Sequence, residues 1–599
     1  MNSNDAAPYY RRPGILVAIL TVMGAVVRLW NFSRVGLEHF DEGIYAFAGL
    51  WAVRPSGLAT LDPSVISYAP PGLPILVGLS YLLTFPWPGV SGLSAIVPAE
   101  LCGIAAIPVM YWIGARTFNV GTGIAAAALL AAAGPHVAFS RMALTDAPFL
   151  LAWLVALGLG GRFLERPGAG RAAAFGLAVG VAQNVKYNGW LIGAILAATV
   201  IVDCVVGSVE SRRRSRRALG FGLLAAVVAA VVYAPWFLFV ERHGGYGAVL
   251  KHQRGYLMPA TSWLPNLRLQ LAQWVALSGL ISGALTWGAV GWGLAWIGRH
   301  LVGPAREPSR WSRLWTRLTL LGGIALMGVL PTLPWWLGLA LAPWLLRDTR
   351  PAVRLVGAGW VVLTVLTPFY HPYARLMLPL QAFCWLIAAG VIGEILPDAE
   401  LNDERSWPVP RRSARGIVLT LAAGVGVACG FLIEPRAVPY PALLAPSDSL
   451  KSVAAKIATR IKTRGGPTIE VYARPSLTFY LNTVHGLPTT SLPSYPDFTS
   501  SIIVPGRPPT KWVIIDEVLC LGGPPMQAGF GRAGLHGEGD VVFPDFLPLT
   551  TMLDADPHAA YGTSMFGADL NGPTDWRFSQ LIRYVPPRAR VIATPLWSP

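Results

Sequence analysis

The chain has 599 residues, of which 53% are hydrophobic and only 13% are charged, and its formal net charge is +16. Because an average soluble domain has roughly 25% charged residues, this composition excludes an ordinary soluble protein and indicates a membrane protein with many spans. The positive charge does not predict a nucleic-acid partner. It lies in short loops between apolar runs, with SRRRSRR at 211–217 the densest, and cytoplasmic loops of membrane proteins collect such residues.

The N-terminal part contains an apolar run at about 13–31 that lacks a small-residue cleavage site, so we expect a retained span and not a signal peptide. The next run, 72–86, is short of the roughly 20 residues that a span needs, and it contains Pro74 and Pro86. We therefore expect this second run to be interfacial or re-entrant.

Further apolar runs follow up to about residue 433, and their orientation is fixed by placing the basic loops on the cytoplasmic side. Together with the first run they predict thirteen spans, and an odd number sends the C-terminal segment to the outer face. The other twelve spans are predicted at 94–114, 120–139, 147–163, 172–185, 188–206, 218–239, 271–298, 317–332, 333–346, 355–368, 375–395 and 416–433.

Several polar residues that are unusual in so apolar a chain gather at the outer ends of these spans. They are Asp41 and Glu42 of GLEHFDEGIYAF (36–47), Asp146 of SRMALTDAPF, Lys186 of NVKYNG, and His371 and Arg375 of FYHPYARLML. Two carboxylates can supply a general base, while Lys, Arg and His supply the positive charge that holds a phosphate. This set suits group transfer from a phosphorylated lipid.

Each of these residues also has a purely structural interpretation. Asp146 stands two residues before a proline and is a candidate helix N-cap. Arg375 lies at a span end, from which a long basic side chain can reach the membrane interface. Asp203, near an inner span end, is expected to be interfacial.

Glu100 is a separate case, because the predicted topology puts it in the outer half of a span, where a carboxylate without a partner is expensive. We expect Glu100 to be neutral or to pair with Arg28 or Arg141.

The C-terminal segment alternates helical and strand patterns. A capped amphipathic helix is predicted at about 448–463 and a short helix at PSLTFYLN (475–482), with strands at TIEVYA (468–473), KWVIID (511–516) and RARVIAT (588–594). Residues 521–577 are rich in Gly and Pro and predict long loops. The chain is therefore divided into a transmembrane catalytic domain, 1–435, and a soluble α/β domain, 436–599.

Five stretches of the membrane part carry a family resemblance: FDEGIYA, APPGLPILVGLSYLL, SRMALTDAPFLLAWLVALG, GLAVGVAQNVKYNGWL and YHPYARLMLPL. Together they resemble the GT-C glycosyltransferases of the protein O-mannosyltransferase and lipid A aminoarabinose transferase type. The most specific part is the Asp-Glu pair after the first span combined with the Asp after the third. The chain departs from the family pattern at SYAPPG, where many relatives have His, Glu or Lys before Pro-Pro, and at SAIVPAE, where many have Arg.

This resemblance implies about thirteen transmembrane helices of the GT-C fold and an extracytoplasmic C-terminal α/β domain, in the plasma (inner) membrane. It also implies a sugar donor on a polyprenyl monophosphate, and transfer to a protein, lipid or glycan acceptor on the outer face. A single displacement inverts the anomeric centre.

The resemblance also implies roles for individual residues. Asp41 is the implied base, and Glu42 and Asp146 shape the site. A divalent metal ion that bridges Asp41, Asp146 and the phosphate is left open. The implied ligands of the donor phosphate are Lys186, Arg375, His371, Tyr187, Tyr370 and Arg141.

Three other kinds of protein are alternatives. The nearest is an oligosaccharyltransferase that uses a pyrophosphate-linked glycan. A secondary transporter is expected to show internal repeats and broken helices that meet at mid-membrane, whereas here no repeat is evident and the charges gather at span ends. A non-catalytic scaffold has no need for carboxylates and cations on one face.

Overall fold

The structure is a computed structural model that describes the chain in a series of segments. These are residues 13–37, 39–53, 70–85, 89–277, 332–370, 373–395, 449–464, 470–473, 475–487, 489–491, 511–516, 540–542 and 590–595. Several predictions lie outside the described residues: the span at 416–433, most of the spans at 271–298 and 317–332, His371, and the loops of 521–577 apart from 540–542. Those three residues form a strand, which the sequence did not predict.

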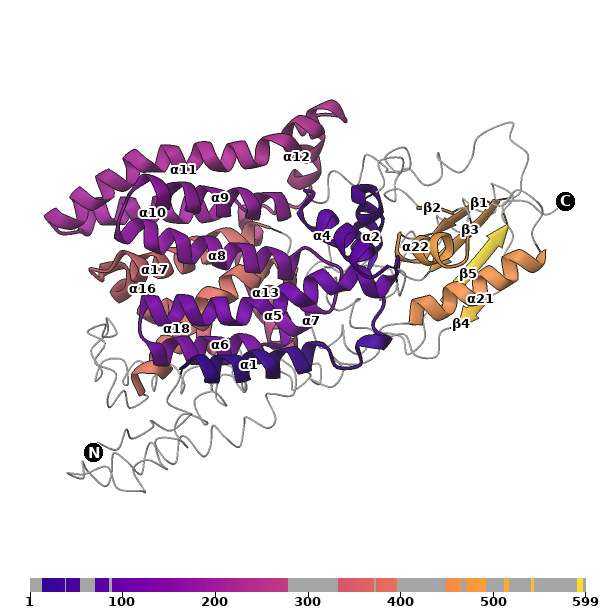
Figure 1. Cartoon of the computed structure of the whole chain (residues 1–599), viewed down its shortest axis with the longest axis horizontal. Helices are drawn as coiled ribbons and strands as arrows, with labels where there is room; N and C mark the ends of the chain where they lie inside the picture. The colour runs from indigo at the N-terminus through magenta and orange to yellow at the C-terminus, as the bar shows by residue number, and fades with distance from the viewer. Residues whose placement is uncertain are drawn as a thin grey trace, which may run out of the picture.

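Long apolar helices run side by side and form the body of the molecule (Figure 1). Among the described residues, six helical segments are long and apolar enough to cross a membrane, and a bent pair that turns by 59° makes a seventh if it is one span. The six contain α1 (Pro13–Arg28), α5 (Gly92–Thr117), α8 (Asp146–Glu165), α11 (Val209–Arg242), α17 (Pro351–Leu366) and α18 (Leu378–Ile395). The bent pair is α6 (Val120–Ala132) and α7 (Gly134–Ser140).

These seven segments coincide with seven of the thirteen predicted spans, so the predicted helical protein with many membrane spans is confirmed. Three more predicted spans are helices of 15 to 17 residues: α9 (Ala169–Val185), α10 (Leu191–Val206) and α16 (Leu333–Arg347). Helix α13 (Trp263–Leu277) begins before the span predicted at 271–298. The total of thirteen stays a prediction.

Short helices gather at one end of this bundle. They are α2 (Phe40–Val53), α4 (Gly72–Leu83) and α12 (Tyr246–Arg254), with 3-10 turns at η2 (Phe32–Arg34), η4 (Ala260–Ser262), η5 (Thr367–Phe369) and η6 (Ala374–Met377). Helix α4 has 12 residues, about 18 Å at 1.5 Å each, so it is too short to cross the roughly 30 Å hydrocarbon core. This length agrees with the prediction of an interfacial or re-entrant segment.

Small residues let neighbouring helices approach closely. A Cβ on Gly176 of α9 would lie 2.2 Å from the carbonyl oxygen of Ala225 of α11, so only glycine fits where these two backbones meet. Membrane helices associate through such contacts because lipid tails provide no hydrophobic driving force between them.

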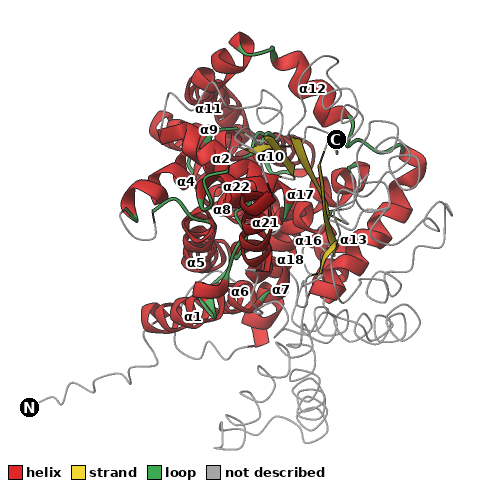
Figure 2. Cartoon of the chain, turned by 90° about the vertical axis from the view of Figure 1, so that its right-hand side faces the viewer, coloured by secondary structure: helices red, strands yellow, loops and turns green. Residues whose placement is uncertain are grey.

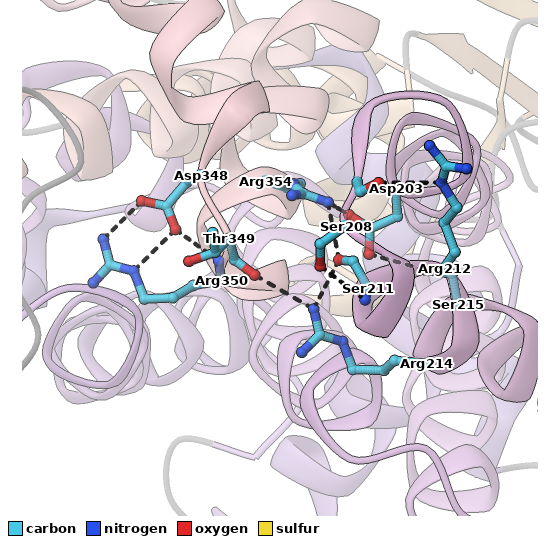
Figure 3. A network of polar contacts seen from close by, with 11 residues as sticks. Asp203, Ser208, Ser211, Arg212, Arg214, Ser215, Asp348, Thr349, Arg350 and Arg354 are labelled. Atoms are coloured by element: carbon cyan, nitrogen blue, oxygen red, sulfur yellow. Dashed lines mark hydrogen bonds and ion pairs between the residues drawn. The ribbon is translucent and has the colours of Figure 1, made fainter.

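A buried polar network lies where α10 ends and α11 begins (Figure 3). This is the end of the bundle opposite α2 and α4 (Figure 1). Asp203, at the end of α10, is 1% exposed and forms an ion pair with Arg354 of α17. Its Oδ2 also accepts a hydrogen bond of 2.9 Å from Ser215 Oγ of α11. Three helix ends therefore close over Asp203, and its expected depth at the membrane interface stays a prediction.

We predict that Asp203→Ala destabilises the protein by about 3–5 kcal/mol, because it leaves the Arg354 guanidinium buried without its carboxylate. The measurement is the thermal unfolding midpoint in detergent. Asp203→Leu combined with Arg354→Met should recover most of the loss. As a control, Asp348→Ala breaks the more exposed pair with Arg350 and should cost about 1 kcal/mol or less. Equal midpoints for Asp203→Ala and the parent protein contradict this prediction.

The described C-terminal residues form a small mixed sheet with two helices. The strands are β1 (Glu470–Ala473), β2 (Thr489–Ser491), β3 (Lys511–Asp516), β4 (Asp540–Val542) and β5 (Arg590–Pro595), in the spatial order β2-β1-β3-β5-β4. Strand β1 is parallel to β2 and β3, whereas β5 is antiparallel to β3 and β4. The predicted helices are α21 (Ser449–Arg464) and α22 (Pro475–Thr483). How far the domain extends over 436–599 stays a prediction.

Candidate active site at the helix ends

The first turn of α2 is held by a reciprocal cap that involves the predicted Asp-Glu pair. The N-cap residue, His39, accepts a hydrogen bond of 2.9 Å from the Asp41 backbone N–H through its Nδ1. Glu42 reaches back and accepts from the His39 backbone N–H at 2.8 Å. This is a variant of the capping box, in which the N-cap side chain binds the second amide of the helix instead of the third. It satisfies two of the amide groups that a helix N-terminus leaves without partners.

The second oxygen of Glu42 joins two distant parts of the chain. Its Oε1 accepts a hydrogen bond of 2.8 Å from the Ala143 backbone N–H, in the turn between α7 and α8. With both oxygens bound to buried amides, Glu42 positions the neighbouring Asp41 relative to the turn that leads to Asp146. The predicted role of Glu42 in shaping the site stays a prediction, and this contact shows how the side chain could perform it.

Asp41 forms a buried ion pair with Arg375. The distance from Arg375 Nη2 to Asp41 Oδ2 is 2.9 Å, and the two side chains are 14% and 7% exposed. Burial by itself raises the pKa of Asp41, but the positive charge of Arg375 and its hydrogen bond lower that pKa below the ordinary value, with help from His39. Asp41 is therefore a carboxylate at neutral pH.

Asp146 forms a second buried ion pair, with Lys186. The distance from Lys186 Nζ to Asp146 Oδ1 is 2.6 Å, and the Asp146 side chain is only 1% exposed. Thr145 is the N-cap of α8, so the interpretation of Asp146 as the N-cap is wrong: it is the first residue of the helix. Its Oδ2 is buried and has no hydrogen-bond partner among the residues that the structure describes.

Lys186 occupies the C-cap position of α9, where a positive charge interacts favourably with the helix dipole. Burial lowers the pKa of Lys186, and the Asp146 carboxylate offsets part of that effect. The charges of Asp41 and Arg375 also act on this ammonium group. The two ion pairs therefore form one electrostatic site, assembled from α2, α8, α9 and the segment before α18.

Tyr45, one turn after Asp41, lies within the influence of both carboxylates. Burial, and then the charges of Asp41 and Asp146, raise the pKa of its hydroxyl well above the ordinary value. The hydroxyl therefore keeps its proton. Sequence reasoning passed over Tyr45, and its position in GLEHFDEGIYAF, one helical turn beyond Asp41, is the signal that points to it.

Arg375 also contacts an aromatic ring, which belongs to a group of three tyrosines. Its guanidinium carbon lies 5.2 Å from the centre of the Tyr373 ring, and Tyr256 stacks on Tyr370 with ring centres 5.7 Å apart. The Tyr370 hydroxyl donates a hydrogen bond of 2.6 Å to Gln253 Oε1 of α12. Tyr370 thus ties α12 to the Arg375 segment, and its predicted contact with the donor phosphate stays a prediction.

His252 of α12 is a further group near the site that sequence reasoning did not single out. Burial lowers the pKa of His252, and the charge of Asp41 partly offsets this. The residue stands in a loop between predicted spans, where no motif distinguishes it.

Two predicted phosphate ligands are held by other contacts. Arg141 donates two hydrogen bonds through Nη1, of 2.5 and 2.6 Å, to the carbonyl oxygens of Arg28 and Trp30 at the end of α1. The Tyr187 hydroxyl accepts a hydrogen bond of 3.2 Å from Trp236 Nε1 of α11. Both side chains support the framework beside the ion pairs, and their role toward phosphate stays a prediction.

Glu100 lies deeper in the bundle, on α5. It is 1% exposed, and neither of its oxygens has a hydrogen-bond partner among the described residues. Burial is the largest influence on its carboxyl group, followed by the charges of Arg141 and Arg28, the two arginines named as its candidate partners. No hydrogen bond joins it to either arginine among the described residues, so its pairing or neutral state stays a prediction. Glu100 therefore belongs to the positive surroundings of the α1 end and not to either ion pair.

The sequence left open a divalent metal ion that bridges Asp41, Asp146 and the phosphate. Among the described residues, no group of three or more His, Cys, Asp or Glu side chains is arranged to hold a metal ion. Asp41 and Asp146 each face a cation of the chain through one carboxylate oxygen. We assign no chemical step to a metal.

Comparison with known proteins supports the predicted resemblance. Residues 68–239, which include Asp146 and Lys186, match the family of dolichyl-phosphate-mannose-protein mannosyltransferases. No curated protein matches the chain.

Among solved structures, ArnT from Cupriavidus metallidurans bound to undecaprenyl phosphate is similar over 98% of this chain and 99% of its own, with a TM-score of 0.52 and 16% identity. The Pmt1-Pmt2 complex of S. cerevisiae bound to the sugar donor aligns with 41% of this chain and 36% of its own (TM-score 0.31, 19% identity). The Archaeoglobus fulgidus oligosaccharyltransferase in the apo form aligns with 88% of this chain and 72% of its own (TM-score 0.48, 13% identity).

The resemblance to GT-C glycosyltransferases is thereby confirmed. The predicted enzyme class, a membrane glycosyltransferase, is confirmed with it. The fold is shared with ArnT over nearly the whole length of both chains, whereas the family match is confined to the part that contains α4 to α11.

We predict that Glu42→Ala lowers the thermal unfolding midpoint and destabilises the protein by about 2–5 kcal/mol, because two buried backbone N–H groups lose their acceptor. The matched control is Glu165→Ala, which breaks a half-exposed contact of 3.4 Å with Arg116 and should cost about 1 kcal/mol or less. Similar midpoints for the two variants would show that Glu42 does not hold the turn.

Proposed function

We propose that this chain moves a sugar from a polyprenyl-monophosphate carrier to an acceptor on the outer face of the membrane, with inversion at the anomeric carbon. The observation that carries the proposal is the pair of buried ion pairs, Asp41–Arg375 and Asp146–Lys186, at one end of the helices. A structure of the same fold, ArnT, binds undecaprenyl phosphate, which is a polyprenyl monophosphate. The acceptor is a protein, a lipid or a glycan.

Buried ion pairs are costly to form, so stability alone does not explain why two of them lie at one end of the helices. A function of these charged groups does explain it. Taking two charges out of water costs several kcal/mol each, and apolar residues of similar size would often be at least as stable. Buried ionisable groups whose pKa values are shifted by burial and by neighbouring charges are common at catalytic and binding sites. Here two such pairs lie together beside a protonated tyrosine and a platform of aromatic rings.

In this proposal Asp41 accepts the proton of the acceptor hydroxyl. The acceptor oxygen forms a bond to the anomeric carbon, and the bond between that carbon and the phosphate oxygen breaks. The electron pair leaves with the polyprenyl phosphate, and the proton stays on the Asp41 carboxyl until it passes to water. Positioned general-base catalysis of this kind contributes about 10²- to 10⁴-fold.

Arg375 links phosphate binding to the strength of the base. Its charge keeps the pKa of Asp41 low. When the donor phosphate shares that charge, Asp41 loses part of its stabilisation as an anion and accepts a proton more readily. The same arginine stabilises the charge that grows on the departing phosphate.

Lys186 and Asp146 form the second half of the proposed site. The ammonium group has three donors, of which one faces Asp146 Oδ1, so it can hold a phosphate oxygen as well. The buried Oδ2 of Asp146, which has no partner among the described residues, can accept a hydrogen bond from a sugar or acceptor hydroxyl. These contacts would align donor and acceptor, which is most of what catalysis needs when the leaving group is already a phosphate.

The proposed orientation puts this site on the extracytoplasmic side of the plasma (inner) membrane. Helix α11 begins with a basic stretch that includes Arg212, Arg213, Arg216 and Arg217, and it begins at the end of the bundle opposite the ion pairs. Basic loops favour the cytoplasmic side. The C-terminal sheet lies beyond the ion-pair end and is therefore proposed to be extracytoplasmic.

We predict that Asp41→Asn lowers the transfer rate about 10²- to 10⁴-fold while the protein remains inserted, folded and able to bind donor. Asn keeps the shape and most hydrogen bonds of Asp but cannot accept the proton. The measurement is transfer of radiolabelled sugar from a polyprenyl-phosphate donor to a mixed acceptor extract. Asp348→Asn, at the opposite end of the bundle, is the control. An Asp41→Asn protein with full turnover rules out this base.

The role of Lys186 can be tested without leaving a buried carboxylate unpaired. We predict that Asp146→Asn keeps or increases affinity for polyprenyl monophosphate, because it frees Lys186, whereas Asp146→Asn combined with Lys186→Met weakens binding about 10-fold or more. The measurement is the dissociation constant of undecaprenyl phosphate in detergent, with undecaprenyl pyrophosphate as the parallel ligand.

Equal affinities of these two variants for the monophosphate would show that Lys186 does not bind the donor. Tighter binding and faster turnover with a pyrophosphate-linked donor would favour the oligosaccharyltransferase-like alternative.

A further inference from the structure

Helix α22 of the C-terminal segment lies directly against α2, the helix that carries Asp41. In Figure 1 the two helices are neighbours between the bundle and the sheet, and Figure 2 shows α21 and α22 in front of the bundle. A Cβ on Gly43 would lie 2.1 Å from the Ser476 backbone nitrogen and 2.2 Å from the Pro475 carbonyl carbon. The backbones therefore touch at the residue that follows the Asp-Glu pair.

Two hydrogen bonds join α22 to the residues just before α2. The Leu37 backbone N–H donates to the Tyr480 hydroxyl at 2.7 Å, and the Ser476 hydroxyl donates to the His39 carbonyl oxygen. Both side chains are buried, with Ser476 0% and Tyr480 2% exposed. Since buried hydrogen bonds are costly to leave unmade, these contacts fix the backbone that enters α2.

His39 connects this docking to Asp41. Its carbonyl oxygen accepts from Ser476, its Nδ1 accepts from the Asp41 backbone N–H, and its own N–H donates to Glu42. If the hydrogen bond from Ser476 is lost, His39 can shift, and Asp41 can shift with it because its backbone N–H donates to His39. Phe47 and Phe479, in edge contact with ring centres 5.4 Å apart, fix the next turn of α2 against α22.

We propose that Ser476 and Tyr480 are positioning residues of the active site, which hold Leu37 and His39 so that Asp41 lies in line with Arg375 and the acceptor. The proposal rests on the function proposed above. In this proposal the C-terminal segment contributes to the active site. Gly43 is glycine because α22 approaches the α2 backbone closely at that position. Misplacing a reacting group by about 1 Å can cost about 10²-fold in rate.

The kinetic test compares Ser476→Ala, Tyr480→Phe and the double variant with the parent chain. We expect the double variant to lose roughly 10- to 100-fold in kcat at saturating donor and acceptor, with KM for the donor changed less than about 2-fold. Ser476→Thr keeps the hydroxyl and should recover most of the rate that Ser476→Ala loses. Thr483→Ala is the matched control, because its hydroxyl donates only to Phe479 within α22 and should leave kcat unchanged.

A second measurement does not depend on turnover. Hydrogen exchange of the backbone amides at 37–43 should be faster by roughly 10-fold or more in Tyr480→Phe and Ser476→Ala than in Thr483→Ala. Faster exchange together with a lower kcat at an unchanged KM supports the proposal. Unchanged exchange at 37–43, or a kcat equal to that of Thr483→Ala, overturns it.

The two proposals fail in different ways. If the parent chain transfers no sugar from a polyprenyl-phosphate donor, the proposed function falls, and the exchange measurement alone decides whether α22 positions Asp41. If Gly43→Ala folds, it should give the same exchange pattern as the α22 variants. Gly220→Ala, whose added Cβ would meet no atom within 4 Å, should match the parent chain. Identical exchange for Gly43→Ala and Gly220→Ala counts against the docking.

Discussion

Burying an ionised carboxylate among apolar helices is so costly that the rest of the site depends on how Asp41 is compensated. The charge of Arg375 supplies that compensation and keeps Asp41 ionised. This constraint fixes where α2 must begin relative to the segment before α18. The capping box of His39 and Glu42 then sets the direction of the Asp41 side chain, because it secures the first turn of the helix.

Buried carboxylates at the two ends of the bundle differ in how completely their oxygens are paired. At the end that carries the basic stretch of α11, Asp203 is closed in by Arg354 and Ser215, and its partners join α10, α11 and α17. That arrangement is what a structural cross-link requires. At the other end, Asp146 keeps one buried oxygen without a partner among the described residues, beside a second ion pair. An acceptor left open in this way is useful to a substrate and of no benefit to stability.

The contact between α2 and α22 brings together residues from opposite ends of the chain. Helix α22 contributes hydroxyl groups to the backbone on which the Asp41 helix begins, and Gly43 leaves room for it. Because membrane helices pack through small residues, the same device that joins α9 to α11 also brings a soluble helix against the proposed site. The C-terminal segment and the bundle are thus one functional unit in this proposal.

The sequence by itself determined the membrane class, the positions of seven membrane-length helical segments and the presence of carboxylates and cations at their ends. Hydropathy and helix signals are local, so they can be read along the chain. Only the tertiary structure decided that Arg375 pairs with Asp41 and Lys186 with Asp146, that Glu42 binds backbone amides, and that Asp203 is buried. These outcomes depend on which helix ends meet in space, and charge or spacing along the chain does not specify that.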